Sequence, residues 1–510
     1  MKITVGRPHI ILFFLIATAV QATNLYVSAR GGTGIPPYTN WAMAPSNIQT
    51  VVNWAAADDA VWISNGVYVL TSSISITKGI AVIATNGVVV IDGNYSNTTN
   101  RCVYMDSAAA VIDGLTISNG YSTDKGGGIY VVNGAARNCM IQNNTALTNG
   151  GGVYLANNSR LENSIVMQNT SLSNGAGISA EQGVITNCLV VSNRASGLGG
   201  GVIFNSSGIM VSSTDSYNSA LEGGGIYFAN GLASNCLIYG NTATNGGGGF
   251  KIWINGSLAN CIIENNTSSQ HGGGGYSIGN GSPIAYVRNC IIRNNSAVLN
   301  GGGMEMSGAI QMDHCIIVSN WCNNYGGGIA FDFAGTYIRN SLVYGNSAPR
   351  GGGVYLRMAG SIQNCTIASN TALTGVGGGV YCISGSLGAG TGSVQNTIIY
   401  FNTAPGNPAS SNYYSAASGG NAFFTNCCMA PATNSGVLGA ARCIEVNPNF
   451  SDKDQCDYHL SVSSPCINAG TNQDWMTNSV DLDGRIRIRY GTVDMGAYEL
   501  IYNGTIYTIP

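Results

Sequence analysis

Three charged residues, Glu305, Asp332 and Arg357, fall at similar places in successive segments of the sequence. Two carboxylates grouped on one face of a strand can serve as general acid and base on a glycosidic bond, or bind calcium. Trp253 and Tyr355 occupy related positions and can provide flat rings for sugar stacking. These residues therefore form the candidate site for a carbohydrate ligand or substrate.

Three interpretations of this group are open. In the first, Lys251, Trp253, Glu305, Asp332, Tyr355 and Arg357 line a sugar-binding groove. In the second, Asp332 and Arg357 are an exposed ion pair between neighbouring strands, which contributes little to stability. In the third, Glu305, Asp332 and Arg357 are catalytic. Glu264 and Arg293 match by the same logic on another strand and predict a second pair, with no aromatic residue nearby.

These side chains are placed by a repeat of about 25 residues that runs from Gly126 to Asn402. Each repeat contains Asn-Cys-x-Ile-x-x-Asn-Thr-Ala and then a glycine triplet followed by Val-Tyr or a similar pair. A fixed period of this size indicates a solenoid. Apolar residues alternate after each triplet, and a second apolar stretch surrounds each Asn-Cys, so the pattern predicts two strands per repeat.

The sequence therefore predicts an all-β protein, a parallel β-helix of about twelve turns stacked about 4.8 Å apart. The composition excludes a helical alternative, because 72 glycines would destabilise helix interiors. On this basis the outward face of the glycine-led strand holds Lys251 with Trp253, Ser277 with Gly279, Glu305 with Ser307, Ala330 with Asp332, and Tyr355 with Arg357.

Asparagine recurs at two fixed positions of the repeat. One file runs without a gap from Asn144 to Asn402, and the other precedes the small residue of most repeats. Asparagine tolerates turn conformations, and stacked amides can donate to one neighbour while accepting from another. We predict two internal asparagine ladders. Asp215 breaks the apolar file of the second strand.

Composition and the N-terminus limit the class of protein. Charged residues make up 8%, the formal charge is −3, and Lys and Arg are scattered, so nucleic acid is not an expected partner. Lys2 and Arg7 precede the apolar run 10–20, and Val20-Gln21-Ala22 is a cleavage site, so residues 1–22 are predicted to be a signal peptide. We expect a secreted or cell-surface protein with no membrane span in the mature chain.

Four further segments follow the predicted signal peptide. Residues 23–111 hold a cap and irregular first turns, including a short helix over 46–57 with a Ser46/Gln49 capping box. Residues 112–404 are the regular repeats, 405–446 a loop-rich wrap, and 447–510 a C-terminal module. Most of the 15 cysteines are expected to pack as small apolar residues, whereas those at 427, 428, 443, 456 and 466 are expected to be bridged.

The C-terminal module contains Asn-Pro-Asn-Phe at 447–450, Ser-Pro-Cys-Ile-Asn-Ala-Gly at 464–470, Asp-Leu-Asp-Gly at 481–484 and Val-Asp-Met-Gly-Ala-Tyr-Glu at 493–499. It resembles the choice-of-anchor Q module of exported bacterial right-handed β-helix proteins. The repeats resemble those of polymorphic outer-membrane proteins and of the wider pectate-lyase-like superfamily. The resemblance implies a right-handed helix and an extracellular protein, without a settled activity. The anchoring signal that usually follows such a module is not recognised before Pro510.

Weaker candidates lie elsewhere. Asp481, Asp483 and Asp494 suggest a calcium site, since Asp-x-Asp-Gly resembles the start of some calcium loops, although the further ligands of that pattern are missing. No other cofactor is indicated. His314, within Asp313-His314, is expected to be a hydrogen-bonded substitute in the asparagine file, and His271 is expected to be solvated.

The sequence favours a non-catalytic, adhesin-like β-helix that presents a polar face to a polysaccharide or cell-surface glycan. The alternative is a polysaccharide lyase or glycoside hydrolase that uses the Glu305, Asp332 and Arg357 face. Because one fold hosts both classes, the fold alone does not decide between them.

Overall fold

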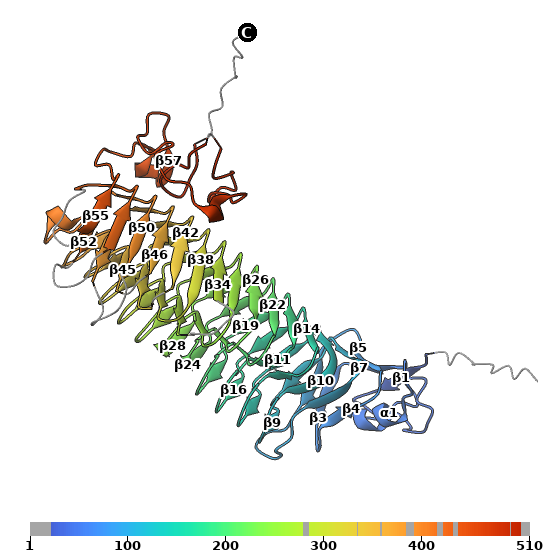
Figure 1. The fold of residues 1–510 in the computed structure, drawn as a ribbon. Helices are drawn as coiled ribbons and strands as arrows, with labels where there is room; N and C mark the ends of the chain where they lie inside the picture. The colour runs from blue at the N-terminus through green and yellow to red at the C-terminus, as the bar shows by residue number, and fades with distance from the viewer. Residues whose placement is uncertain are drawn as a thin grey trace, which may run out of the picture.

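The chain forms a rod of stacked turns, with a helix at one end and a small module beside the other (Figure 1). The computed structural model describes residues 22–278, 285–333, 335–357, 360–383, 392–415, 422–431, 437–489 and 491–500. The predicted signal peptide lies outside the described residues except for Ala22, and so does Gly279 of the predicted outward face.

Each regular turn contributes four strands to three parallel sheets, of 29, 15 and 11 strands. The sequence predicted two strands per turn. The other two are short, and they form because stacking in register gives even a two-residue stretch backbone partners on the neighbouring turns. The largest sheet takes the glycine-led strands: β10 (Ile129–Arg137), β13 (Val153–Leu155), β17 (Ile178–Ala180), β21 (Val202–Phe204), β25 (Ile226–Phe228), β29 (Phe250–Ile252), β33 (Gly275–Ser277), β37 (Met304–Met306), β41 (Ile329–Phe331), β45 (Val354–Leu356) and β49 (Val380–Cys382).

The same sheet takes a second strand before each Asn-Cys position: β14 (Arg160–Glu162), β18 (Val184–Thr186), β22 (Ile209–Val211), β26 (Leu232–Ser234), β30 (Ser257–Ala259), β34 (Ala285–Arg288), β38 (Ile310–Asp313), β42 (Tyr337–Arg339), β46 (Ser361–Gln363), β50 (Ser393–Gln395) and β53 (Ala422–Thr425). At its N-terminal end lie β1 (Asn24–Val27), β2 (Ala60–Ile63), β4 (Ile74–Ile76), β5 (Ala81–Ala84) and β7 (Val103–Asp113).

The 15-stranded sheet contains the strand after each Asn-Cys position: β3 (Gly66–Val69), β6 (Val89–Asp92), β8 (Thr116–Ser118), β11 (Met140–Gln142), β15 (Ile165–Met167), β19 (Leu189–Val191), β23 (Thr214–Ser216), β27 (Leu237–Tyr239), β31 (Ile262–Glu264), β35 (Ile291–Arg293), β39 (Ile316–Val318), β43 (Leu342–Tyr344), β47 (Thr366–Ala368), β51 (Ile398–Tyr400) and β54 (Cys428–Met429). Its 15 strands correspond to a rod about 67 Å long at the usual strand spacing of about 4.8 Å.

The 11-stranded sheet contains the strands at the Thr-Ala position: β9 (Tyr121–Ser122), β12 (Thr145–Ala146), β16 (Thr170–Ser171), β20 (Arg194–Ala195), β24 (Ser219–Glu222), β28 (Thr242–Gly246), β32 (Thr267–Ser268), β36 (Ser296–Ala297), β40 (Trp321–Cys322), β44 (Ser347–Ala348) and β48 (Thr371–Ala372). Between the sheets, like side chains stack on like. Phe204 and Phe228, for example, are fully buried and stack with ring centroids 5.4 Å apart.

One of the two predicted asparagine ladders is internal. The buried file contains Asn144, Asn169, Asn193, Asn218, Asn241, Asn266, Asn295, Asn320, Asn346, Asn370 and Asn402. From Asn169 onward, each side-chain oxygen accepts from the backbone N–H and the side-chain amide of the asparagine one turn earlier, as Asn169 Oδ1 does from Asn144 at 3.0 Å for both. The third glycine of each triplet lies against this ladder. A Cβ on Gly152 would stand 2.8 Å from Asn169 Nδ2, so the glycine and asparagine signals belong to one contact.

The second ladder is not internal, and this prediction was wrong. The asparagines before the small residue have left-handed backbones, with φ of 53° at Asn138 and 55° at Asn260, and in the first turns they are exposed. They form the outer corner of the turn, because a left-handed residue there reverses the chain and points its side chain away from the core. The last four, Asn340, Asn364, Asn396 and Asn426, are buried beneath the C-terminal module.

The N-terminal cap contains α1 (Ile48–Trp54), with Ile48, Val51 and Val52 buried. The predicted capping box at Ser46 and Gln49 is wrong. Asn47 caps the helix by accepting from Thr50 N, and Gln49 instead bonds β4, accepting from Ser75 N at 2.7 Å and donating to Ser75 O at 3.1 Å. No helix of the described residues is long and apolar enough to cross a membrane.

The segment 405–446, predicted to be a loop, extends the sheets. Among its strands β52 (Tyr413–Ser415) pairs with β49, and β55 (Val437–Ala441) pairs with β53. The C-terminal module contains the antiparallel pair β56 (Phe450–Asp452) and β57 (Asp457–Leu460). All 15 cysteines are free, so the expected bridges in the tail are not formed in this structure.

Candidate functional site

The candidate site lies on the outward side of the glycine-led strands β29, β33, β37, β41 and β45. Their central residues are register partners, and the column reads Lys251, Tyr276, Glu305, Ala330 and Tyr355. The sequence had placed Ser277 in this column and Tyr276 inside. That assignment is wrong because the run of glycines has a fourth member, Gly275, which takes the inward position: a Cβ there would stand 2.2 Å from the Phe250 ring. Ser277 is fully buried.

Lys251 is 2% exposed although it points outward from the core. Its Nζ lies 2.7 Å from Glu222 Oε2, and Asn245 donates to the other Glu222 oxygen at 2.7 Å. The ammonium also lies 5.0 Å from the centre of the Tyr276 ring and 6.0 Å from that of Trp253. Burial lowers the pKa of Lys251, and Glu222 opposes that shift. The cation is therefore held by one carboxylate and two ring faces.

Glu305 is 2% exposed and both of its oxygens have partners. His271 Nδ1 lies 2.8 Å from Oε2, and Ser307 Oγ donates to Oε1 at 3.1 Å. The His271 ring stacks on Tyr276 at 5.4 Å. Burial raises the pKa of Glu305, and the bond to Glu305 raises the pKa of His271. The expectation that His271 is solvated was therefore wrong, because its neighbour on the next turn is a carboxylate.

Asp332 and Arg357 are paired as predicted. Arg357 Nη1 donates to the two carboxylate oxygens at 2.9 and 3.0 Å, which raises the pKa of the guanidinium. The Arg357 side chain remains 42% exposed and that of Asp332 20%. Trp253 is 48% exposed. Of the predicted ligand-binding residues, these three are the ones a solute can reach.

Aromatic rings continue the column toward the C-terminal end. Tyr355 is 4% exposed, and its ring centroid lies 4.7 Å from that of Tyr325 and 5.8 Å from that of Tyr381. Tyr325 and Tyr381 also contact each other at 6.0 Å, and Tyr414 lies 5.8 Å from Tyr381. Because the Tyr355 side chain is almost fully buried, it cannot offer a free ring face to a sugar. Its predicted role as a platform is not supported by this geometry.

The residue before each glycine triplet is the part of the site that sequence reasoning missed. It lies beside the central strand residue of the following turn: Glu222 meets Lys251, His271 meets Glu305, and Tyr325 meets Tyr355. The first glycine of the triplet has a positive φ, 59° at Gly272. This sharp turn places the residue before the triplet beside the column of central strand residues. A search for opposite charges between the pre-glycine residue and the next turn could have found the pairs.

The other predicted groups are structural. Arg293 Nε lies 2.5 Å from Glu264 Oε2, as expected of register partners. His314 contacts Asp313 at 2.9 Å and, through Nε2, the backbone oxygen of Val480 at 3.0 Å, so it is a hydrogen-bonded member of the outer asparagine file.

The three aspartates of the suggested calcium site have other partners. Asp481 is fully buried and accepts the backbone N–H groups of Asp483, Arg485 and Glu499. Asp494 accepts two further backbone N–H groups, and Asp483 pairs with His459 at 2.8 Å. The part of the chain that the structure describes contains no group of three or more metal-ligating side chains. These bonds give the three aspartates structural roles, so the geometry does not favour the calcium hypothesis.

Comparisons with known proteins agree with the architecture. Residues 127–295 match a family model described as the right handed beta helix region. No curated protein matches the chain. Together with the parallel stacking, the match makes this chain a right-handed parallel β-helix protein.

Three solved structures are similar over most of their length. The pectate lyase Pel9A is 14% identical at a TM-score of 0.25, covering 94% of this chain and 97% of its own. XylC in complex with xylose is 9% identical at a TM-score of 0.29, with coverages of 94% and 99%. A rhamnogalacturonan lyase is 12% identical at a TM-score of 0.20, with coverages of 86% and 95%. Likeness at this level carries no argument about activity.

Proposed function

We propose that this protein is an exported rod that binds carbohydrate on the outward face of its glycine-led strands without cleaving it. One observation carries the proposal. Trp253 and the Asp332–Arg357 pair are accessible on this face, whereas Glu305, the acid best suited to catalysis, is 2% exposed with both oxygens bonded. A binding site can use the accessible groups as they stand, but a catalytic one would require Glu305 to leave its partners.

The accessible groups suit a polysaccharide. An indole ring offers a flat apolar face, and a guanidinium that uses one nitrogen on Asp332 keeps further donors for hydroxyl or carboxylate oxygens. The ligand would therefore be a glycan carrying hydroxyl or acidic groups. Nucleic acid remains an unexpected partner because the cations on this face are paired with carboxylates.

Export and surface retention belong to the same proposal. They rest on the basic start and apolar run of residues 1–22, and on the resemblance of 447–499 to choice-of-anchor modules and of the repeats to polymorphic outer-membrane proteins. In this reading the rod presents its binding face outside the cell, as an adhesin does.

One observation favours cleavage as a second candidate. Burial raises the pKa of Glu305, which is the direction expected of a general acid that must stay protonated near neutral pH. A lyase or hydrolase would then use Glu305 with Asp332 as the second carboxylate and Arg357 as the contact to the sugar. Hydrolysis would require both carboxylates to flank the scissile bond.

The binding proposal is tested with the chain from Thr23 onward on a glycan array, followed by titration of the best ligand. Trp253→Ala should weaken that binding roughly tenfold, or about 1.4 kcal/mol, because it removes the exposed ring. Trp54→Ala is the matched control, since Trp54 is 53% exposed on the capping helix. Equal losses in both variants, or no binding by the parent chain, would contradict the proposal.

Catalysis is tested separately on neutral and acidic polysaccharides, by release of reducing ends and of unsaturated products. We expect none. Turnover that disappears in Glu305→Gln and Asp332→Asn would replace the binding proposal with the enzymatic one.

A further inference from the structure

The first strand of the 15-stranded sheet has a free edge. Within the described part of the chain, β3 pairs with β6 and with no other strand. Gly66 N donates to Val88 O and Leu70 N donates to Asp92 O, both on the β6 side. Since alternate residues of a parallel strand direct their backbone groups to opposite sides, Val67 and Val69 direct theirs to the free edge.

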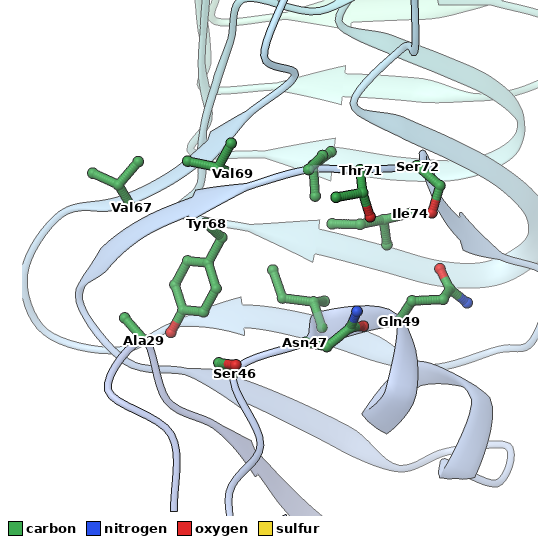
Figure 2. A pocket seen from close by; sticks show the side chains of 12 residues that line it. Ala29, Ser46, Asn47, Gln49, Val67, Tyr68, Val69, Thr71, Ser72 and Ile74 are labelled. Carbon is green, nitrogen blue, oxygen red and sulfur yellow. The ribbon is translucent and has the colours of Figure 1, made fainter. Parts of the chain in front are cut away.

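At this end of the rod, the N-terminal cap pairs with the edge of the largest sheet but leaves the edge of the 15-stranded sheet open. In the largest sheet, β1 lies on β2, and the Gln49 side chain bonds both backbone groups of Ser75 in β4 as a strand would. Beside β3 the cap leaves a groove of about 340 Å³, with residues 67–72 on one side and Ala29 and residues 46–49 on the other (Figure 2). An edge of this kind is a template for pairing with a further strand.

Nothing in β3 protects this edge. Proteins usually guard an edge strand with charged side chains or proline, yet residues 66–70 read Gly-Val-Tyr-Val-Leu. Val67 and Val69 are each 59% exposed, while Tyr68 is 5% exposed. A strand added here would extend the sheet outward and cover the apolar end of the core.

The chain carries a segment with the composition of such a strand. Residues 501–510, which lie outside the described residues, read Ile-Tyr-Asn-Gly-Thr-Ile-Tyr-Thr-Ile-Pro. β-branched and aromatic residues are those that strands prefer. The segment follows Leu500, in the C-terminal module at the far end of the rod from α1 (Figure 1).

This segment cannot reach the β3 edge of its own chain. Ala497 N donates to Thr366 of β47, which lies twelve strand positions from β3. That separation is about 58 Å at about 4.8 Å per strand. Ten extended residues span at most about 36 Å. Only a second copy can bring the two together.

We propose that residues 505–509 of one copy add as a strand to the free edge of β3 in another copy, so that rods join head to tail. Main-chain hydrogen bonds to Val67 and Val69 would give the affinity, and alternate side chains would enter the groove beside Tyr68 and Ile74. Such a contact does not close on itself and builds an open chain of rods. The inference is independent of the carbohydrate proposal.

The test uses two variants of the chain from Thr23 onward. The edge variant, Val67→Lys with Val69→Lys, keeps the C-terminal segment intact, and the tail variant, Ile506→Asp with Ile509→Asp, keeps the edge intact. The edge variant changes only exposed side chains, because Val67 and Val69 are each 59% exposed. Circular dichroism of both variants should show unchanged folding. Val88→Lys is the control, because Val88 is 67% exposed and lies outside the edge.

In sedimentation velocity, the mass of the parent chain and of the control should increase with concentration. Each variant alone should need at least tenfold higher concentration to reach the same degree of assembly. An equimolar mixture should stop at a one-to-one complex, because it holds one intact edge and one intact segment. A parent chain that stays monomeric at 1 mM, variants that assemble like the parent, or a mixture that forms no complex would overturn the proposal. So would loss of assembly in the edge variant alone, because another segment would then occupy the groove.

Discussion

The two asparagine files of this β-helix have the same residue and the same period but opposite places in the structure. The inner file is buried and bonded from turn to turn, whereas the outer file stands at a left-handed corner and is exposed in the first turns. Within the inner file the left-handed residue is the preceding one, such as Asn143 or Gln168. A difference of one position therefore decides whether the amide points into the rod or away from it.

Near its C-terminal end, the outer file bonds the C-terminal module that covers it. Arg487, which is fully buried, donates to Asn340 Oδ1 at 2.9 Å, to Glu499 Oε1 at 2.8 Å and to the backbone oxygens of Asn364 and Gly496. Asn396 exchanges bonds with Thr471 in the same way. The same position of the repeat is therefore exposed in the first turns and forms the docking surface for the C-terminal module in the last turns.

Removing a member of the inner file should have the largest effect. Asn266→Ala deletes the acceptor of Asn241 N and Nδ2, and the donor to Asn295 Oδ1 and Ile238 O. Because buried groups left without partners each cost about 1 to 3 kcal/mol, we expect a loss of about 4 kcal/mol in the free energy of unfolding, read from denaturant titration.

The matched control is Asn260→Gly in the outer file, which removes an exposed amide and keeps a residue that accepts a positive φ. It should cost less than about 1 kcal/mol. Equal losses would mean that the inner ladder contributes no more than a corner residue does.

The second effect concerns the docked module. Arg487→Met breaks a buried ion pair, and such changes cost about 3 to 5 kcal/mol. We expect the lower limit, because burial raises the pKa of Glu499, so a carboxylate that has lost Arg487 can take up a proton near neutral pH. Hydrogen exchange should accelerate in residues 447–500 and stay unchanged in the turns before Asn340. Unchanged exchange in the module would show that other contacts hold it.

The third effect depends on pH and concerns Asp215, the acid inside the rod. Asp215 is fully buried and Asn218 donates to one of its oxygens at 3.1 Å, whereas the other oxygen has no hydrogen-bond partner among the described residues. Burial raises its pKa well above the ordinary value. An acid with a raised folded pKa is protonated in the folded state while the unfolded chain ionises, so it lowers stability as the pH rises above about 4, by up to about 1.4 kcal/mol per pH unit.

Asp215→Asn should remove this dependence. The melting temperature of the variant should be close to that of the parent chain at pH 4 and higher than it at pH 7. The difference between the two should increase with pH over this range. A gap that is constant with pH would show that the carboxyl does not titrate there.

The repeat made the fold predictable from the sequence. Which side chains point outward at the corners, and which partners they meet on the faces of the rod, could not be predicted from it. The alternation after each triplet and the Asn-Cys columns predicted the two main strands, the apolar core and the Asp332–Arg357 pair. The assignment of Tyr276 failed because a fourth glycine, filled by the Phe250 ring, shifts the strand by one residue. The bonds of Glu305 and Lys251 were missed because their partners, His271 and Glu222, stand just before the glycine triplet of the preceding turn. The alternation within a strand does not relate residues at that sequence distance.

The sequence by itself determined the repeat period. It thereby determined that equivalent residues of successive turns stack on one another, because the backbone and side-chain bonds repeat wherever the residues repeat. Only the tertiary structure decided which asparagine faces inward, which acids are buried and what the C-terminal module covers. Those outcomes depend on one left-handed residue or one missing side chain per turn, and on contacts between parts of the chain more than 100 residues apart, such as Arg487 and Asn340.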